Sequence, residues 1–401
     1  MTAAPPIGPM TGVKVVDLTT NIAGPLSARM LAEMGADVIH IEPPWGDDGR
    51  NSTTPFLGRE GTLYSTCNRS KRGVVIDVKT AGGQAVLKRL LQDTDIFIEA
   101  TVPGSLEALG LGYEELKKVN PRLVQVTVSG WGTQGPLANE PGYAVLAAAY
   151  SGIVRPPQRE DEIPELKGGG PDPTAALLAT ICAMSGLRKR DLTGEGSLVT
   201  TSIFHAAMHL VGAFRVIAED DDTPPEAPRG DGLAGLGGLG VFETADGGWL
   251  YLSAWNDKQF KTLCELADLA YLGESPEYAT RLQRSIHGSE VNELLGHWIS
   301  TMRLDDIVEL LARHKVPASP MRMSVEELFD DPQVVGNEMY KAVEHPTKGR
   351  LWQLRGMLEV DGDHGRMDPA PLFGEHTDEV LTELGYSGEE VSALREAGAV
   401  A

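Results

Sequence analysis

Residues 13–42 read VKVVDLTTNIAGPLSARMLAEMGADVIHIE, and this stretch decides the fold. It opens with a short β-rich run, Val13–Leu18, and closes with a second one, Asp37–Glu42, which two prolines halt. Between the two runs, Ala23–Gly35 has the pattern of a helix, with Pro25 in the first turn, where proline is tolerated, and glycine at the end. A strand, a helix and a second strand in this order indicate a parallel βαβ unit.

The same alternation continues along the first half of the chain. Short apolar strands separated by helices predict a parallel, doubly wound sheet, and therefore an α/β domain. The further strands expected are Val74–Asp77, Asp95–Glu99 and Leu123–Val128, and the helices Gly83–Gln92, Tyr113–Val119 and the alanine-rich Asp172–Arg188.

A second, smaller domain is expected in the middle of the chain. The acidic, proline-rich stretch Glu219–Pro228 is typical of a linker. After it, Gly240–Ser253 predicts a β-hairpin with an Asp-Gly-Gly turn, and helical patterns run from Asp257 to about His314. The chain is thus expected to form a large domain of residues 1–220 and 330–401 and a small α+β domain of residues 221–329.

Composition bounds the classes of partner. The chain has 401 residues, enough for two domains with a large core. It carries 57 acidic residues against 35 Lys and Arg, a net charge of -22. That charge disfavours nucleic acid and anionic membranes as partners. An anionic ligand would need a local basic patch.

Several absences in the sequence indicate a cytoplasmic protein. Cys67, Cys182 and Cys264 are far apart and show no spacing typical of a metal site or a disulfide framework. Met1–Met10 has no pattern of a signal peptide. No apolar run reaches the roughly 18 residues that a membrane-spanning helix needs. We expect neither a metal nor a membrane partner.

Two short motifs each allow more than one interpretation. Gly235–Gly240 reads GLGGLG and fits G-x-G-x-x-G, but a dinucleotide fingerprint follows a strand and opens a helix. Since this segment follows a linker and leads into a predicted strand, a loop that closes over a ligand is favoured. The basic cluster Arg69–Arg72 (RSKR) is either a solvated turn or a cradle for the phosphates of a ligand such as CoA.

The stretch Ser129–Pro136 (SGWGTQGP), followed by Pro141–Ala144 (PGYA), resembles the active-site loop of the family III CoA-transferases. In that family the motif usually reads SGFGQTGP and then PGYD. Further blocks resemble the family in the same order along nearly the whole chain. They are Gly12–Leu18, Ala23–Pro25, Gly35–Pro43, Asn68–Arg72, Leu109–Glu114, Asn120–Leu123, Val316–Ala318, Asp331–Val334, Glu344–Pro346 and Gly374–Leu381.

The resemblance implies a fold, a substrate and a set of binding residues. It implies a Rossmann-like large domain built from both chain ends, a small domain from the middle, and an intertwined dimer of interlocked rings. The substrate would be a coenzyme A thioester, with no cofactor bound permanently. The CoA-binding residues carried over are Asn21, Ile22, Ala23, Glu42, Arg69, Lys71 and Arg72.

The chain also departs from the family pattern. The resemblance puts the nucleophilic Asp, which attacks the thioester in a covalent mechanism, at the position of Ala144. The family's ENFRPG segment reads EATVPG at Glu99–Gly104. Racemase members use a His and an Asp as acid and base; Tyr143 stands at the first position and Asp172 at the second. An ordinary Tyr pKa near 10 suits proton exchange at neutral pH poorly.

Three functions therefore stay open. The first is a non-catalytic subunit that supports a homologous catalytic partner in a CoA-transferase, with succinyl-CoA as donor and an aromatic succinate as acceptor. The second is a homodimeric isomerase, racemase or lyase that uses Asp172 or Glu140 as its base. The third is an ordinary CoA-transferase inactivated by an Asp-to-Ala change at Ala144.

Overall fold

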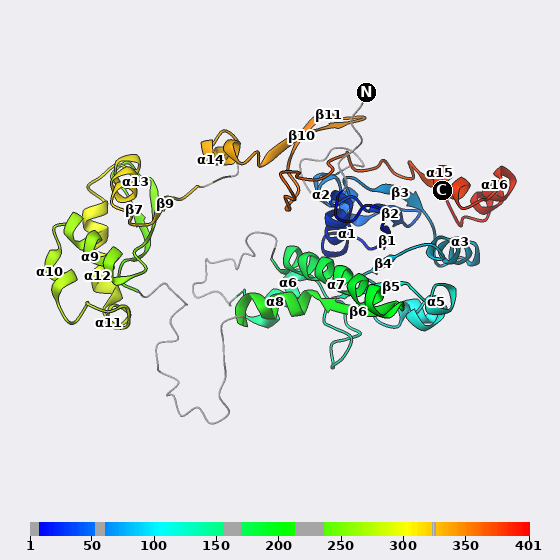
Figure 1. Cartoon of the computed structure of the whole chain (residues 1–401), viewed down its shortest axis with the longest axis horizontal. Coiled ribbons are helices and arrows are strands. Elements are labelled where there is room, and N and C mark those ends of the chain that lie inside the picture. Colours follow the sequence, from blue (N-terminus) through cyan, green and yellow to red (C-terminus); the bar gives the residue numbers. More distant parts are fainter. Residues whose placement is uncertain (1–7, 53–60, 155–169, 213–235, 323, 325) are drawn as a thin grey trace. The chain divides into compact units, whose positions relative to one another are not determined.

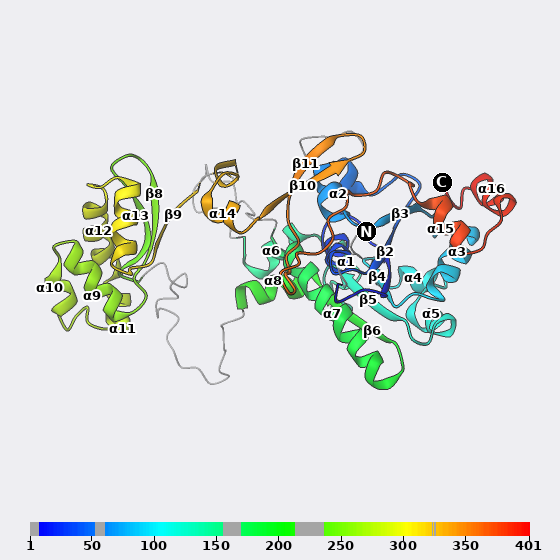
Figure 2. The ribbon, with the colours of Figure 1, turned by 45° about the horizontal axis from the view of Figure 1, so that its top comes forward.

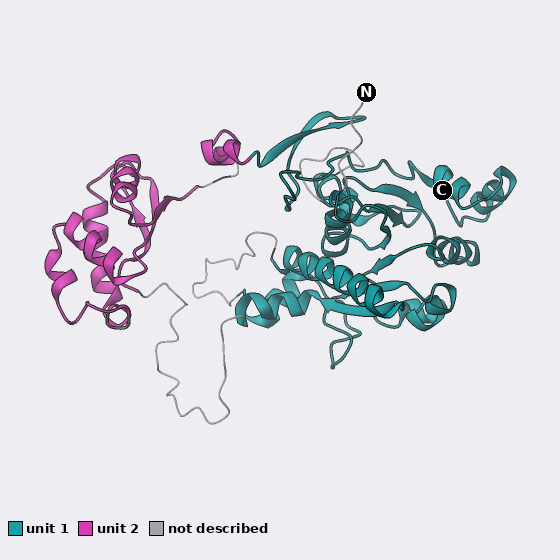
Figure 3. Ribbon diagram, viewed as in Figure 1, with its two compact units in different colours: residues 1–216, 338–401 teal, residues 217–337 magenta. Residues whose placement is uncertain are grey.

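The computed structural model describes residues 8–52, 61–154, 170–212, 236–322, 324 and 326–401. The chain divides into two compact units, which Figure 3 colours separately. One consists of Met1–Val216 and Glu338–Ala401, and the other of Ile217–Asn337. The domain boundaries expected from the sequence, after residues 220 and 329, lie 4 and 8 residues from these divisions.

The large unit is built on a six-stranded, fully parallel sheet in the order β3-β2-β1-β4-β5-β6 (Figure 1). This is the strand order of doubly wound dinucleotide-binding folds, with a reversal between β1 and β4. The parallel sheet that the sequence predicts is confirmed. Its strands are β1 (Lys14–Leu18), β2 (Asp37–Glu42), β3 (Arg72–Val75), β4 (Ile96–Glu99), β5 (Val124–Ser129) and β6 (Ser197–Ser202).

Helices cover both faces of this sheet, and alternate residues of each strand point to opposite faces. Val15 belongs to an apolar cluster with α1 and α7, whereas Val16 belongs to the cluster on the other face. The α1 and α7 helices pack side by side, as Figures 1 and 2 both show. The first face carries α1 (Ala23–Glu33), α7 (Pro171–Thr193) and α8 (Ile203–Gly212); the second carries α3 (Ala81–Leu91), α4 (Ser105–Ala108), α5 (Tyr113–Val119), α15 (Thr377–Glu383) and α16 (Gly388–Glu396).

The C-terminal segment belongs to the large unit and packs beside β3. Ile76 forms an isolated bridge with Val400, and the Asp77 N–H donates to Ala399 O at 2.9 Å. The strand expected at Val74–Asp77 is found at Arg72–Val75, and the two residues after it pair with the chain terminus, although the Ile76 N–H still donates to Glu42 O of β2 at 3.0 Å. The other elements of the unit are η1 (Asp48–Arg50), α2 (Thr62–Cys67), α6 (Ala144–Ser151), β10 (Tyr340–His345) and β11 (Gly349–Leu354).

The small unit pairs an antiparallel sheet with short helices. The predicted hairpin forms β7 and β8, and Gly247 in its turn has a φ of +76°, which glycine adopts without strain. Apolar side chains of the sheet, such as Leu250, pack against the helices in a separate core. The elements are β7 (Leu239–Glu243), β8 (Trp249–Ser253), α9 (Asp257–Leu266), α10 (Ala270–Glu274), α11 (Arg281–Ile286), α12 (Gly288–Ile299), α13 (Leu304–Arg313), β9 (Ala318–Pro320), η3 (Glu326–Leu328) and α14 (Pro332–Gly336).

The glycine-rich motif lies at the start of β7, apart from Gly235, which is outside the described residues. As the sequence predicts, it leads into a strand. Asn292 holds its backbone: Oδ1 accepts from the Gly238 N–H at 2.8 Å, and Nδ2 donates to Leu239 O at 2.9 Å. The described part of the motif is thus anchored within its own unit.

Candidate active site

The carboxyl ends of β1, β2 and β4 meet at one edge of the sheet, where the strand order reverses between β1 and β4. In open parallel sheets, ligands bind in the crevice at such a point. A cavity of about 180 Å³ lies there, lined by segments that follow these strands and β3. Its lining includes Thr19, Pro43, Trp45, Lys79 and Thr101. We call this cavity the switch-point pocket.

Trp45 and Lys79 give the switch-point pocket its recognition chemistry. The Lys79 Nζ lies 5.3 Å from the centroid of the Trp45 ring, and Trp45 is 65% exposed. An exposed aromatic ring beside a cation suits a planar, anionic ligand such as a nucleotide. Sequence reasoning missed both residues. The signal that could have found them is their place just after predicted strands at one sheet edge.

The segment Glu99–Gly104, whose sequence differs from the family pattern, forms another wall of the switch-point pocket. It brings Ala100 and Thr101 to the lining. Thr101 turns back toward β4, since its N–H and Oγ1 donate to Glu99 Oε2 at 2.9 and 2.6 Å. Small side chains here leave this wall open. The larger side chains of the lining belong to the other walls.

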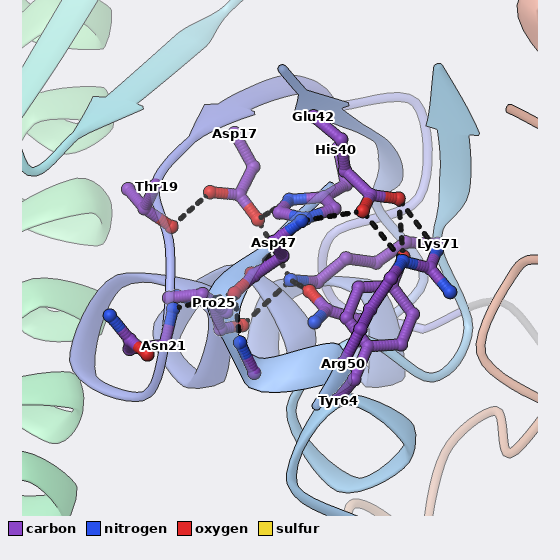
Figure 4. Close-up of polar contacts among 12 residues, drawn as sticks. Asp17, Thr19, Asn21, Pro25, His40, Glu42, Asp47, Arg50, Tyr64 and Lys71 are labelled. Atoms are coloured by element: carbon purple, nitrogen blue, oxygen red, sulfur yellow. Dashed lines mark hydrogen bonds and ion pairs between the residues drawn. The ribbon is translucent and has the colours of Figure 1, made fainter. Parts of the chain in front are cut away.

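A buried network of charged side chains occupies the same ends of β1 and β2 (Figure 4). Asp17 Oδ2 accepts a hydrogen bond from Lys71 Nζ at 2.8 Å and lies 2.9 Å from His40 Nδ1. The other Asp17 oxygen accepts from Thr19 Oγ1. Lys71 also donates to Pro25 O at 2.8 Å and to Asn68 Oδ1 at 2.7 Å. All three Lys71 donors are satisfied inside the protein.

The network fixes the charges of its members. Burial alone would raise the pKa of Asp17, but Lys71 and His40 outweigh it and hold this pKa well below its usual range. Burial alone would lower the pKa of His40, but Asp17 and Asp47 outweigh it and raise this pKa to about 9. The His40 imidazole is thus protonated at neutral pH and lies between two carboxylates.

The basic cluster does not form the exposed phosphate cradle that was one of its two interpretations. Lys71 is fully buried in the network, and Arg69 is buried against Glu33, with Nε 2.6 Å from Oε1. Arg72 donates to Asp37 at 2.8 and 3.1 Å and to Glu383 at 2.8 and 3.0 Å. The reason is that acidic residues from four other segments neutralise these cations, which sequence spacing does not reveal. The interpretation as a solvated turn is also wrong for Arg69 and Lys71.

Glu42, expected at the CoA site, is committed to an internal contact. Both its oxygens accept from Arg50, at 2.6 Å each, and Oε1 also accepts from the Tyr64 hydroxyl at 2.9 Å. Burial would raise the pKa of Glu42, but Arg50 and His40 outweigh it and lower this pKa. The Glu42 side chain therefore holds the loop after β2, and its neighbour Pro43 reaches the switch-point pocket.

The expected residues Asn21, Ile22 and Ala23 form the turn between β1 and the start of α1. Asn21 has a φ of +67°, in the left-handed region that glycine favours. Its N–H donates to Asp47 Oδ1 at 3.1 Å. Ile22 is the N-cap of α1 and supplies no side-chain cap, and Ala23 is buried as the first helical residue. The preceding Thr19 and Thr20 line the switch-point pocket. We call Thr19–Ile22 the β1–α1 turn.

Asp172 has the most distinctive carboxyl of the predicted site residues. It is half-buried in the first turn of α7, and among the described residues none donates a hydrogen bond to its carboxyl or forms an ion pair with it. Burial raises its pKa to about 6. At pH 7 most of this carboxylate is ionised, yet it lacks much of the solvation that stabilises an ordinary surface Asp. A carboxyl with so perturbed a pKa is a candidate for a catalytic role.

The helix turn that carries Asp172 and the β1–α1 turn border the same apolar cluster. One helical turn further along α7, Ala176 packs in a small apolar cluster with Leu26, Met30 and Cys67. Ile22 of the β1–α1 turn packs against this cluster. Burial raises the pKa of Cys67 to about 11, and the Asp172 charge contributes to the rise. The turn thus connects the switch-point pocket with the surroundings of Asp172.

The loop carrying Ala144 lies beyond the end of β5. Ala144 opens α6 and offers no titratable group, and Tyr143 before it is largely exposed. Glu140 is also exposed. A Cβ built on Gly130 would lie 2.5 Å from Gly142 Cα, so glycine at both positions is what lets the two ends of this loop approach. Of these three residues, Asp172 is half-buried, whereas Tyr143 and Glu140 are exposed.

The described part of the chain offers neither a metal site nor a membrane span. No group of three or more His, Cys, Asp or Glu residues there could hold a metal ion. Of the helices that the structure describes, none combines the length and the apolar character needed to cross a membrane.

Known proteins resemble this chain over nearly its whole length. Human succinyl-CoA:glutarate CoA-transferase is 31% identical over 98% of this chain and 90% of its own length. The beta subunit of succinyl-CoA–L-malate CoA-transferase from Chloroflexus aurantiacus is 30% identical over 96% of this chain and 97% of its own. An Asp-to-Ala variant of Rv3272 from Mycobacterium tuberculosis superposes with a TM-score of 0.82, at 25% identity, over 93% of this chain and 98% of that one.

The sequence profile described as CoA-transferase family III matches residues 10–377. A match of that extent agrees with the six-stranded parallel sheet, the switch-point pocket and the ordered family blocks of the sequence. The chain belongs to CoA-transferase family III, whose members move CoA between acyl-CoA thioesters and carboxylic acids without a bound cofactor.

Proposed function

We propose that this chain is itself a catalytic CoA-transferase and that the Asp172 carboxylate is its nucleophile. The observation that carries the proposal is the state of that carboxyl: half-buried, unpartnered among the described residues, and with a pKa raised to about 6. A poorly solvated carboxylate that is still ionised at pH 7 attacks a carbonyl more readily than a solvated one. Ala144 then has no catalytic task.

The reaction divides into exchanges that each conserve charge. The Asp172 carboxylate adds to the thioester carbonyl carbon, the C–S bond breaks, and CoA leaves as a thiolate, so a mixed anhydride remains. The thiolate adds to the aspartyl carbonyl and expels the donor carboxylate, which gives an aspartyl-CoA thioester. The acceptor carboxylate then attacks this thioester, and the returning thiolate attacks the acceptor carbonyl of the new anhydride. Asp172 is released as a carboxylate.

The CoA nucleotide would occupy the switch-point pocket. Trp45 offers a ring for the adenine, and Lys79 offers a cation for a phosphate. These two residues stand in for the side chains that Glu99–Gly104 and the buried Arg69 and Lys71 do not supply. Support for this assignment is the position of the pocket at the reversal of strand order, which borders the β1–α1 turn leading toward Asp172.

The named relatives suggest the substrate class. Both use succinyl-CoA as donor, with glutarate or L-malate as acceptor by their names. We propose succinyl-CoA as the donor for this chain and a dicarboxylic acid as the acceptor. An aromatic succinate, expected from the heteromeric precedent, is one dicarboxylate of this class and belongs in the acceptor panel.

A second candidate function, a supporting subunit beside a homologous catalytic chain, is favoured by Ala144 and by the changed Glu99–Gly104 segment. An apolar surface also favours a partner: Leu177, Ile181 and Met184 are exposed along α7. The C. aurantiacus relatives are named as alpha and beta subunits. The same surface would serve an intertwined homodimer, so the oligomer alone does not distinguish the two functions.

The deciding experiment measures CoA transfer by the purified chain alone. Succinyl-CoA is supplied with glutarate, L-malate or benzylsuccinate, and the new thioester is measured by mass spectrometry. Activity in the wild type, its loss in Asp172→Ala, and a hydroxylamine-trapped hydroxamate on the peptide containing Asp172 are expected. Full activity in Asp172→Ala would overturn the proposal. Turnover only after a homologous chain is added, unaffected by Asp172→Ala, would establish the supporting subunit.

A further inference from the structure

The β1–α1 turn is placed to act on both halves of the substrate site. Thr19 and Thr20 line the switch-point pocket, and Ile22 packs against the cluster next to Asp172. A shift of this turn would therefore move one wall of the nucleotide site relative to the nucleophile. Whatever fixes the turn also fixes the alignment of a bound thioester.

The backbone of the turn is strained at Asn21. Its φ of +67° lies in the left-handed region, which costs most residues with a Cβ about 1 kcal/mol and costs Asn less than most. Strain of this kind persists only where neighbouring groups hold the backbone. Here the holding contact is the hydrogen bond from the Asn21 N–H to Asp47 Oδ1, at 3.1 Å. Figure 4 shows Asp47 between this turn and the His40 ring.

Asp47 is itself held by several contacts. It is 2% exposed, and the Oδ1 that holds Asn21 also accepts from the Gly49 N–H at 2.7 Å. Its own N–H donates to Glu42 Oε2 at 3.0 Å. Its Oδ2 lies 3.7 Å from His40 Nε2 in an ionic contact. The carboxylate therefore connects the strained turn with the rigid ends of β1 and β2.

We propose that Asp47 is a positioning residue for CoA transfer, which holds Asn21 in its strained conformation and so aligns the bound thioester with Asp172. This inference rests on the proposed function. Asp47 acts through the β1–α1 turn and makes no contact with the reacting atoms. The rest of its network serves the same end, since His40 and Glu42 keep the carboxylate in place.

The test is the kinetics of Asp47→Ala with succinyl-CoA. Loss of the acceptor frees Asn21, and misalignment of reacting groups by about 1 Å lowers a rate by on the order of 100-fold. We expect kcat to fall by about 10- to 100-fold, whereas KM for succinyl-CoA changes less than about threefold because Trp45 and Lys79 still bind the nucleotide.

Two further variants separate positioning from loss of stability. Asp47→Asn keeps an oxygen that accepts from Asn21 and Gly49, so most of kcat should return. Tyr64→Phe is the matched control, since it removes one hydrogen bond to Glu42 Oε1 but leaves Arg50 bonded to both Glu42 oxygens and the Asp47 N–H bonded to Oε2. We expect its kcat to stay within about twofold of wild type. All assays are run well below the thermal midpoint of each variant.

Hydrogen exchange gives a readout independent of turnover. Amides of residues 19–22 should exchange faster in Asp47→Ala and at the wild-type rate in Tyr64→Phe. Unchanged kcat and unchanged exchange in Asp47→Ala would overturn the inference, as would equal kcat losses in Asp47→Ala and Tyr64→Phe. If the wild type had no turnover, or Asp172→Ala kept it, the proposed function would fail, while the exchange rates would still decide whether Asp47 holds the turn.

Discussion

Lys71 Nζ lies 2.8 Å from Asp17 Oδ2, with both side chains fully buried, so a cation that the sequence offers for phosphate binding serves an internal ion pair. Removing one partner of a buried pair leaves an uncompensated charge. We therefore expect Lys71→Ala to lower the free energy of unfolding by about 3–5 kcal/mol. Urea unfolding followed by circular dichroism measures this loss.

Lys79→Ala is the control for that measurement, because Lys79 is exposed at the rim of the switch-point pocket. Its unfolding free energy should stay within about 0.5 kcal/mol of wild type. If Lys71→Ala were equally stable, the buried pair would not be a principal stabilising contact of the sheet edge.

Binding of CoA should depend on the residues that the sequence did not point to. Lys79→Ala and Trp45→Ala each remove one contact expected with the nucleotide, and each should raise the dissociation constant of CoA by about tenfold. The Lys79 effect should shrink at high salt, because it is ionic, whereas the Trp45 effect should persist. Isothermal titration calorimetry at two salt concentrations separates them.

Lys258→Ala gives the matched change of net charge, at an exposed site in the small unit. It should leave CoA affinity within about twofold of wild type. Equal weakening by Lys79→Ala and Lys258→Ala would mean that only the global charge matters, and the switch-point pocket would lose its assignment.

Local sequence patterns could predict five of the six strands of the sheet, but they missed the edge strand β6. The runs at β1 and β2 are buried on both faces and flanked by turn residues, so their patterns are clear. The edge strand β6 reads SLVTTS, and only alternate parts of it are buried, so it lacks an apolar run. Helix α15 packs beside β3 although some 300 residues separate them, and only the folded chain brings them together.

The same limit applies to the candidate site. The sequence pointed to Asp172 and to the β1–α1 turn, since both resemble family positions. It did not reveal that Lys71 pairs with Asp17, 54 residues away, or that His40 lies between Asp17 and Asp47. Whether a charge is buried or free depends on which strands become neighbours. Spacing along the chain therefore cannot distinguish a phosphate ligand from a structural cation.

His40 should make stability depend on pH on the alkaline side. Its pKa is raised to about 9 from an ordinary 6.5, so the protonated ring stabilises the folded state. This contribution is fully present below pH 6.5 and is lost as the pH rises through 9, and it amounts to roughly 3 kcal/mol. The unfolding free energy of the wild type should fall accordingly between pH 6.5 and 10.

Comparison with His40→Gln isolates the contribution of the network around His40, because groups outside this network titrate equally in both proteins. The difference in unfolding free energy between wild type and variant should be largest near pH 6 and should shrink above pH 9. His205→Gln, at an exposed site, should follow the wild type at every pH. A constant difference between wild type and His40→Gln would show that the ring stabilises through packing and not through its charge.

Replacing Asp172 by Asn should raise the stability of the chain and abolish its activity. The Asp172 carboxyl has a pKa of about 6 in the folded chain against an ordinary 3.8, so the folded state loses stability as the pH rises from about 4 to 6, and the full penalty remains above pH 6. Asp172→Asn removes that penalty and should raise the unfolding free energy at pH 8 by about 3 kcal/mol, with no such gain below pH 4.

In the wild type, kcat/KM should rise with pH through about 6 and then level off, because only the carboxylate attacks the thioester. The variant should be more stable than wild type at pH 8 and yet inactive at every pH. A variant that lost activity together with stability would identify Asp172 as a structural residue, since a nucleophile held in a poorly solvated site is removed at a gain in stability.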